Sequence, residues 1–342
     1  MYRSPRVTGL TADDDAPAIT LGLLVYNGEP FLEKSIESLL AQSFDDFELV
    51  ISDNASTDST EEICRSYADA DQRVRYIRQH DNIGALENFN FLVAQARGRY
   101  FKWVAADDLI APDFLARCFD VLEAHPQYVL CHSLTVTIGS SGEELPNDII
   151  QSSGAAERDG ELEFHPYRPS RRFHDVLLGN TSLMDLWGLM RTDALRNTGL
   201  LKPFVGYEKV LMATLSLYGR FWEIPERLFA YRVHTASLSS QTTAAARQRR
   251  CAPRSRTKAY PRIQYLRGYV SGIAHSDLGL LEKVICFLVI GRYLFQVTKW
   301  LNVLRSSLFG DDFGAGNAEI LRQNSARANR CDFDQGKPGW II

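Results

Sequence analysis

The strongest constraint on the fold is a regular alternation of short apolar runs with longer amphipathic segments between residues 19 and 124. The apolar runs are typical of buried strands, and the segments between them place apolar residues at helical spacing. The predicted strands are Ile19–Val25, Phe47–Ile51, Val74–Gln79 and Tyr100–Ala105; the predicted helices are Phe31–Gln42, Thr57–Ala68, Ala85–Ala96 and Pro112–Ala124. This alternation predicts right-handed βαβ units, and therefore an α/β fold with a mostly parallel central sheet and helices on both faces.

The pattern changes after the fourth unit. Further strands are expected at Val129–Ile138, Trp187–Arg191, Phe221–Ile224 and Phe229–Val233, around a helix at Glu208–Tyr218. The polar stretch 139–169 reads as loops. We therefore divide the main domain, residues 18–240, into a first half at 18–138 and a second half at 139–240.

The remaining segments differ in composition from this domain. Residues 1–17 read as a flexible lead without the apolar core of a secretory signal, and residues 311–342 as a disordered tail. Residues 241–310 form a basic linker followed by an amphipathic helical region. From Arg247 to Arg267 the chain has eight Lys and Arg residues and no acidic one. Such a run is most often a solvated face, and an anionic partner is the second interpretation.

Charge and cysteine usage exclude some classes of protein. The net charge of −4 argues against a general nucleic-acid-binding protein. The six cysteines include no close pair, so there is no CxxC metal or redox motif and no disulfide framework. Reduced thiols favour a cytoplasmic location.

Polar side chains follow the end of each of the first four predicted strands. They are Tyr26-Asn27, Asp53-Asn54, Asn82 to Gly84, and Asp107-Asp108. Ligands of parallel sheets bind at the carboxyl ends of the strands. The topology therefore predicts that these four loops converge on one site.

The same residues carry a resemblance to a known family. The string LLVYNGEPFLEKSIESLLAQSFDDFELVISDNASTDST and its continuation HDNIGALENFNFLVAQARGRYFKWVAADD are similar to family 2 glycosyltransferases. These are inverting enzymes with the GT-A nucleotide-diphospho-sugar transferase fold. The resemblance covers roughly residues 18–235, and its motifs come in the family's order.

The resemblance implies a nucleotide-binding set at the strand ends. Asp53 would accept a hydrogen bond from a base or ribose, and Tyr26 would offer an aromatic face to the base. For Asp53 an Asx-turn is the structural alternative, and for Asn82 and Gly84 a plain turn. The full set is Val25, Tyr26, Asn27, Glu29, Asp53, Asn82, Gly84 and Asp107.

The resemblance also implies a divalent cation, Mn²⁺ or Mg²⁺. Hard cations take carboxylate oxygens together with substrate phosphates. By resemblance Asp107 faces the ribose and Asp108 holds the metal, with His234 beside the metal or the diphosphate. The sequence departs from the family where relatives often carry a further Asp, since Ala105 stands there.

Inverting transfer needs a base for the acceptor hydroxyl. By resemblance this residue is Glu208 in VGYEKVLMATLSLYGRF, where similar sequences usually have Asp; its structural alternative is helix-dipole complementation. Lys209 reads equally as a phosphate contact or a surface residue. Asp185 and Trp187 are candidates for the acceptor pocket, and Trp187 reads equally as core.

The expected function is a metal-dependent inverting glycosyltransferase (hexosyltransferase type) of cell-envelope polysaccharide or glycolipid synthesis. Its partners would be a nucleotide diphosphate-sugar donor and a glycan or lipid-linked acceptor, with no nucleic acid. The basic and amphipathic stretch 247–308 suggests peripheral attachment to the inner face of the plasma membrane; packing on the domain or a homodimer contact are the alternatives. The competing functions are a nucleotidyltransferase and a nucleotide-sugar-binding module that has lost catalysis.

Overall fold

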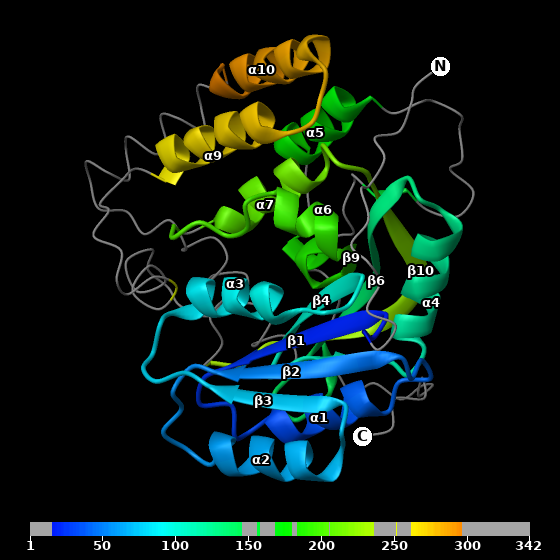
Figure 1. The fold of residues 1–342 in the computed structure, drawn as a ribbon, viewed down its shortest axis with the longest axis vertical. Helices are drawn as coiled ribbons and strands as arrows, with labels where there is room; N and C mark the ends of the chain where they lie inside the picture. Colours follow the sequence, from blue (N-terminus) through cyan, green and yellow to red (C-terminus); the bar gives the residue numbers. More distant parts are fainter. Residues whose placement is uncertain are drawn as a thin grey trace.

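The structure is a computed structural model that describes residues 16–145, 156–157, 168–179, 183–204, 206–235, 251 and 261–295. The flexible lead expected at 1–17, except residues 16 and 17, and the tail expected at 311–342 lie outside the described residues, as does most of the basic run 247–260. Within these ranges a mixed sheet is flanked by helices (Figure 1).

The first half of the chain forms the predicted βαβ units. The elements are β1 (Ile19–Val25), α1 (Leu32–Leu40), β2 (Phe47–Asp53), α2 (Thr60–Ala70), β3 (Val74–Arg78), α3 (Ala85–Gln95), β4 (Tyr100–Ala105) and α4 (Phe114–Ala124). Strands β3, β2, β1 and β4 lie side by side and are parallel. The expectation of a parallel α/β sheet is confirmed.

The remaining strands extend the sheet with mixed pairing. The elements concerned are β5 (Leu109–Ile110), β6 (Tyr128–Ile138), β7 (Glu144–Leu145), β8 (Ala156–Glu157), η1 (Leu183–Trp187), β9 (Leu189–Arg191), α6 (Thr192–Asn197), α7 (Tyr207–Leu215) and β10 (Arg220–Arg232). The strand order is β3-β2-β1-β4-β9-β6-β10-β5, and β9 runs antiparallel to both β4 and β6.

Four of the expected elements differ from the structure in the second half. Trp187 ends a 3₁₀ helix instead of beginning a strand. The two strands expected at 221–224 and 229–233 are one strand, β10, whose pairing with β6 shifts register between Ile224 and Phe229. Pro225 lies at that irregularity and has no N–H to donate, which accounts for the break in the apolar pattern. The helix expected to end at Tyr218 ends at Leu215.

Two apolar cores lie on the two faces of the sheet. One contains side chains of α1, α2 and α4, and the other joins α3 to α5 (Pro169–Leu178), α7, α9 (Pro261–His275) and α10 (Leu280–Leu294). β1 is packed tightly on the second face, since a Cβ at Gly22 would lie 2.7 Å from the ring of Phe101. Helices α9 and α10 lie on the outer side of α5 and α7, and their buried side chains join the core on this face (Figure 1).

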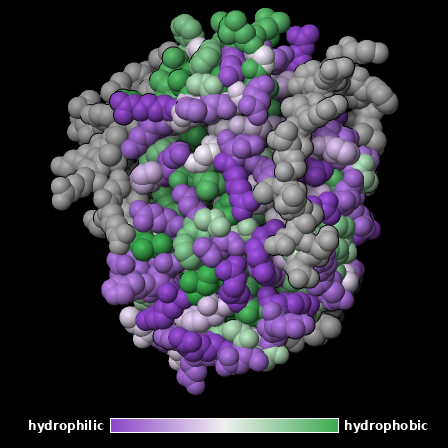
Figure 2. Space-filling view, in the orientation of Figure 1, coloured by the Kyte–Doolittle hydropathy of each residue, from purple (hydrophilic) through white to green (hydrophobic). Residues whose placement is uncertain are grey.

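The two ends of the molecule differ in surface polarity on the face drawn in Figure 2. Figure 2 shows hydrophobic residues gathered at the end of the molecule that α10 occupies in Figure 1, while the opposite end, near α2, is mainly hydrophilic. No helix among the described residues has the length and apolar character needed to cross a membrane.

Candidate active site at the carboxyl edge of the sheet

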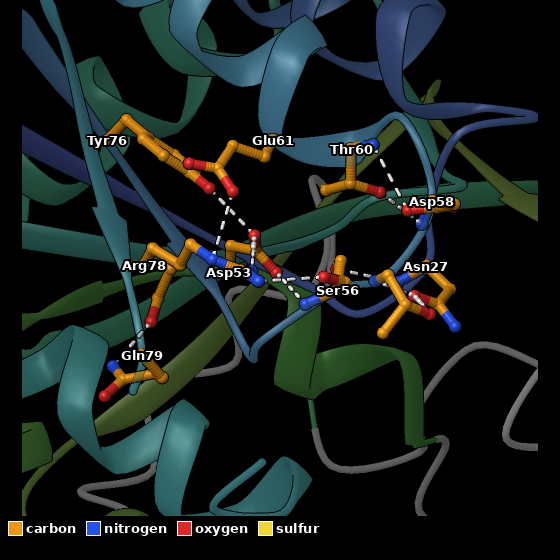
Figure 3. Close-up of polar contacts among 12 residues, drawn as sticks. Asn27, Asp53, Ser56, Asp58, Thr60, Glu61, Tyr76, Arg78 and Gln79 are labelled. Carbon is orange, nitrogen blue, oxygen red and sulfur yellow. Dashed lines mark hydrogen bonds and ion pairs between the residues drawn. The ribbon is translucent and has the colours of Figure 1, made fainter. Parts of the chain in front are cut away.

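Hydrogen bonds join the loops that follow β1 and β2. The Asn27 N–H donates to Ser56 Oγ at 2.9 Å, and the Thr57 N–H donates to Asn27 Oδ1 at 2.9 Å (Figure 3). Asn27 has φ 52°, a left-handed conformation that Asn tolerates better than most residues. Glu29 adds a reciprocal pair, donating from its N–H to Asp58 Oδ2 and accepting the Ser59 N–H. These hydrogen bonds join the loops after β1 (residues 26–31) and β2 (residues 54–59) into one unit, here called the rim.

Asp53 is fully buried at the end of β2. Its Oδ1 accepts the Ser56 N–H at 2.8 Å, which is the Asx-turn alternative, and its Oδ2 accepts from Tyr76 Oη at 2.8 Å and from Arg78 at 3.0 Å (Figure 3). Burial and the hydrogen bond to Asp53 raise the pKa of Tyr76. Both carboxylate oxygens of Asp53 therefore already accept hydrogen bonds from the protein itself.

The third loop is joined to the second by an amide pair. Asn54 Nδ2 donates to Asn82 Oδ1 at 3.1 Å, while Asn54 Oδ1 accepts the Ile83 N–H at 2.9 Å. Asn82 Oδ1 also accepts the Gly84 N–H at 2.9 Å, and Gly84 begins α3 with φ 89°, a conformation that favours glycine. Tyr26, at 42% exposed, leaves an aromatic surface accessible beside these joined loops.

The carboxylates of Asp107 and Asp108 point to different environments. The Asp107 side chain is 26% exposed, and its Oδ2 lies 2.8 Å from His234 Nε2. Asp108 is 1% exposed, and its Oδ1 accepts the Arg232 N–H at 2.9 Å. Burial, and then the neighbouring Asp107 carboxylate, raise the pKa of Asp108 well above its usual range. In this arrangement Asp107, and not Asp108, is the carboxylate that reaches solvent.

The end of β10 fixes this pair of carboxylates. Arg232 is 2% exposed and donates from Nε to the Asp107 carbonyl at 2.8 Å, and from its guanidinium to the Gly139 carbonyl at 2.9 Å. Its guanidinium also lies 4.9 Å from the ring centroid of Phe31, which packs 4.6 Å from the His234 ring. These contacts hold His234, two residues after Arg232, against Asp107.

A buried cation lies behind the carboxylates. Lys102 on β4 is 1% exposed, donates to the Trp187 carbonyl, and has its Nζ 4.4 Å from the ring of Phe114 and 5.1 Å from that of Phe229. Burial lowers the pKa of Lys102 to about 8, and the nearby Asp108 carboxylate opposes that shift. The sequence analysis did not single out Lys102, because its aromatic neighbours Phe114 and Phe229 lie in other segments of the chain.

Glu208 lies in the first turn of α7 and is partly buried. The helix begins after Gly206, whose φ of 84° is left-handed. A Cβ at Gly206 would lie 1.8 Å from Tyr265 Oη of α9. A Cβ at Gly268 or Gly272 of α9 would collide with Val210 or Thr214 of α7. Helix α9, unexpected from the sequence, therefore sets the position of the helix that carries Glu208.

The donor atoms fit a cation that shares its coordination with a ligand. Among the described residues no group of three or more His, Cys, Asp or Glu side chains could hold a metal. Asp107 and His234 supply one carboxylate and one imidazole that converge. Mg²⁺ in particular binds through one or two carboxylates plus phosphate oxygens and water. The pair thus suits a cation that arrives with a diphosphate.

Several sequence predictions do not meet at this edge. Asp185 is fully buried, 3.5 Å from His132 Nε2, and Trp187 packs on Phe89 and Phe229 in the interior. Lys209 is exposed. Ala105 ends β4, where its carbonyl accepts from Ser35 Oγ at 3.1 Å, so no carboxylate stands at that position.

Comparison with known proteins agrees with the fold and the motifs. The profile of the family described as Glycosyl transferase family 2 matches residues 20–197, just over half of the chain. A putative glycosyltransferase EpsH of Bacillus subtilis is 29% identical over 139 residues, which cover 40% of each chain. An uncharacterized glycosyltransferase MJ1057 of Methanocaldococcus jannaschii is 30% identical over 138 residues, 40% of this chain and 48% of its own. The match thus spans less than half the length of either relative.

Solved structures agree on the architecture. Residues 1–349 of TarS from S. aureus in complex with UDP superpose with a TM-score of 0.55 at 17% identity, covering 87% of this chain and 76% of that one. The complex of the same protein with UDP-GlcNAc gives a TM-score of 0.54, also at 17% identity, over 81% and 73%. The GT-A fold predicted from the sequence is confirmed. On the profile match and the fold together, this chain belongs to glycosyl transferase family 2.

Proposed function

We propose that this chain is an inverting glycosyltransferase of the hexosyltransferase type that moves a sugar from a nucleotide diphosphate-sugar to a hydroxyl of a glycan or lipid-linked acceptor. The observation that carries the proposal is the convergence of Asp107 with His234 beside three joined strand-end loops. A rigid rim for a nucleoside and an adjacent pair of cation donors are what a diphosphate-sugar requires. The structural relatives that bind UDP and UDP-GlcNAc support this donor class.

In this proposal the rim binds the nucleoside. Tyr26 stacks on the base, and the backbone of the Val25 to Glu29 loop, held by Ser56 and Thr57, lines the ribose side. Asn82 and Gly84 shape the neighbouring turn. Asp53 acts mainly by holding this rim rigid, since its oxygens already accept hydrogen bonds from the chain. Preorganisation of this kind lowers the entropy lost on binding.

Asp107 and His234 would hold Mn²⁺ or Mg²⁺ in the proposal, and Asp108 positions Asp107 through Arg232. The cation would supply positive charge to the diphosphate and so favour departure of the nucleotide. Lys102 places a positive charge behind the carboxylates and offsets part of their repulsion. Glu208 accepts the proton of the acceptor hydroxyl as that oxygen attacks the anomeric carbon in line with the leaving diphosphate, so the configuration inverts.

Calorimetric titration of UDP and GDP, with and without Mn²⁺, tests the cation site. We expect Asp107→Asn to lose the gain in nucleotide affinity that Mn²⁺ gives, because the solvent-accessible ligand is removed. Asp45→Asn is the matched control, since that carboxylate is 91% exposed and far from the edge in sequence and structure. An Asp107→Asn variant with full metal-dependent affinity would refute the assignment.

Turnover separates the proposal from its competitors. We expect Glu208→Gln to retain donor affinity and to lower the transfer rate by about a hundredfold or more, the scale of a lost general base. Glu62→Gln, on the exposed side of α2, is the control.

Tight nucleotide-sugar binding without hydrolysis or transfer by the unaltered chain would favour a binding module; Ala105 and the buried Asp108 are the features that keep this alternative open. Transfer of a nucleotidyl group to a sugar phosphate would identify a nucleotidyltransferase.

We further propose a role in cell-envelope polysaccharide or glycolipid synthesis at the cytoplasmic side. A thermal-shift panel of nucleotide diphosphates would identify the base, because a ligand that binds the native state raises its melting temperature. Light scattering would test the homodimer.

A further inference from the structure

Helix α10 divides sharply into a packed face and an open face. Cys286, Val289, Ile290 and Tyr293 are buried against the core that contains α5 and α9. On the other side seven large apolar side chains are 41–82% exposed: Leu280, Leu281, Val284, Phe287, Leu288, Leu294 and Phe295. They gather at one end of the molecule in Figure 2. Exposed apolar residues grouped in this way mark an interaction surface.

The angular arrangement of these residues is that of an interfacial helix. At 100° per residue the exposed apolar side chains fall within an arc of about 140°. Gly291 lies inside this arc, and a Cβ built on it would meet nothing within 4 Å. Lys283 and Arg292 fall at the two borders of the arc. A continuous apolar arc with a basic residue at each border suits the boundary between headgroups and acyl chains.

Neither acidic residue of this region lies on the exposed apolar arc of α10: Glu282 is on the packed side, and Asp277, which is exposed, precedes the helix. Glu282 Oε2 accepts the Ser170 N–H at 3.1 Å at the start of α5, on the packed side of α10. Asp277 lies close enough to Tyr218 to raise the pKa of that phenol, second to the effect of burial. These are the only two acidic residues in 247–308, a stretch with twelve Lys and Arg residues.

The uneven distribution of charge along the sequence favours an anionic partner over a second copy of the chain. The chain has a net charge of −4, and residues 247–308 contribute +10, so the remainder carries −14. Within the described part of this stretch, residues 261–295, four basic residues and two acidic ones leave a net charge of +2. An anionic surface attracts a segment of this sign and repels the acidic remainder of the sequence. A second copy docked symmetrically through the same face would instead bring Lys283 and Arg292 of both copies together.

We propose that the exposed face of α10, here called the α10 face, lies on an anionic phospholipid membrane with the helix axis parallel to the surface. Helix α10 has 15 residues, so it is about 22 Å long, shorter than the roughly 30 Å hydrocarbon core. Its other face is packed on the domain, so the helix rests in the interface and does not span. The inference deepens the proposed function, on which it rests only where it places the enzyme beside a lipid-linked acceptor.

Flotation of the full chain with vesicles tests the proposal. We expect binding to vesicles that contain phosphatidylglycerol, weaker binding at high NaCl, and little binding to phosphatidylcholine alone. The variant Leu281→Asp with Leu288→Asp should lower the vesicle-bound fraction about tenfold or more, because it removes apolar burial and adds negative charge to the α10 face. Both side chains are more than 60% exposed, so the fold should be retained.

A matched control adds the same charge at the opposite end. Ser66→Asp with Ala70→Asp lies on exposed positions of α2 and should float as the unaltered chain does. Donor hydrolysis and nucleotide binding in solution are measured on all three proteins. Because flotation needs no turnover, an inactive chain that still floats would count against the proposed function alone.

Three outcomes would overturn the membrane assignment. One is failure of the unaltered chain to float, which would mean that another part of the chain covers the α10 face. The second is equal flotation of the Leu281→Asp, Leu288→Asp variant and the unaltered chain. The third is a dimer in light scattering that this variant converts to a monomer, with no vesicle binding by either protein; the α10 face would then be a contact between copies.

Discussion

Replacing Gly206 by alanine should damage both stability and turnover, because this residue joins α7 to α9. Alanine at φ 84° costs about 1–2 kcal/mol for the left-handed conformation. Its Cβ would lie 1.8 Å from Tyr265 Oη and 2.5 Å from Cζ, so Tyr265 must move. Overpacking of this kind costs about 1–3 kcal/mol. We therefore expect Gly206→Ala to lower the free energy of unfolding by about 2–5 kcal/mol.

A double-mutant cycle separates the two contributions. In a Tyr265→Ala background the clash is absent and only the backbone cost remains, so the two substitutions should couple favourably by about 1–3 kcal/mol in urea unfolding. Gly279→Ala is the matched control: this glycine also precedes a helix, has φ −62°, and has open space around a built Cβ. It should change the free energy of unfolding by less than about 1 kcal/mol.

The kinetic effect should follow from the position of Glu208, two residues after Gly206. A displacement of the base of about 1 Å is enough for a hundredfold loss of kcat, while the nucleotide rim lies on other elements, so the donor Kd should be unchanged. Additive free energies in the cycle would show that Tyr265 does not confine Gly206. A normal kcat in a measurably destabilised Gly206→Ala variant would show that α9 does not position the base.

Two further perturbations test the buried charges. Because the pKa of Lys102 is lowered to about 8 from 10.5, the unfolded chain binds more protons than the folded chain between those values, so the free energy of unfolding rises with pH there. In urea unfolding, the stability that Lys102→Met has in excess of the unaltered chain should therefore shrink by about 3 kcal/mol from pH 8 to about 10.5. A constant difference between the two proteins would mean that Lys102 titrates normally. Asp53→Asn should lower the free energy of unfolding by about 1–3 kcal/mol, because it weakens the hydrogen bonds that this fully buried carboxylate accepts from Ser56, Tyr76 and the partly exposed Arg78. Asp45→Asn should be near neutral. Loss of nucleotide affinity at unchanged stability would instead show that Asp53 contacts the base.

The sequence predicted the βαβ half well because each element there has its own periodicity and each strand end its own polar residues. Strands β1 to β4 and the convergence of Asn27, Asn54 and Asn82 follow from that local pattern and from the topology of a parallel sheet. Glu208 was recognised only by resemblance, and its position depends on Gly206 and α9.

Contacts distant in sequence account for what the pattern missed. The burial of Asp108 depends on the Arg232 N–H, 124 residues away, and adjacent carboxylates carry no signal of which one turns inward. The local pattern around Lys102 does not predict its burial, because the aromatic rings that surround its Nζ come from α4 and β10. The sequence prediction placed a helix only after Leu278 and none at α9; in the structure Gly268 and Gly272 of α9 leave room for Val210 and Thr214 of α7.

The dependence of the Asp107–Asp108 pair on β10 also has a consequence for synthesis of the protein. A ribosome releases the chain from the N-terminus at about 5–20 residues per second, so the βαβ half emerges well before Arg232 and His234. Until then neither carboxylate has its native partner from β10. A nascent chain can therefore join the loops after β1 and β2 early, but it brings His234 to Asp107 only after the last strand of the sheet has left the exit tunnel. Under the proposed function, the cation site would then be complete only when the whole sheet has been synthesised.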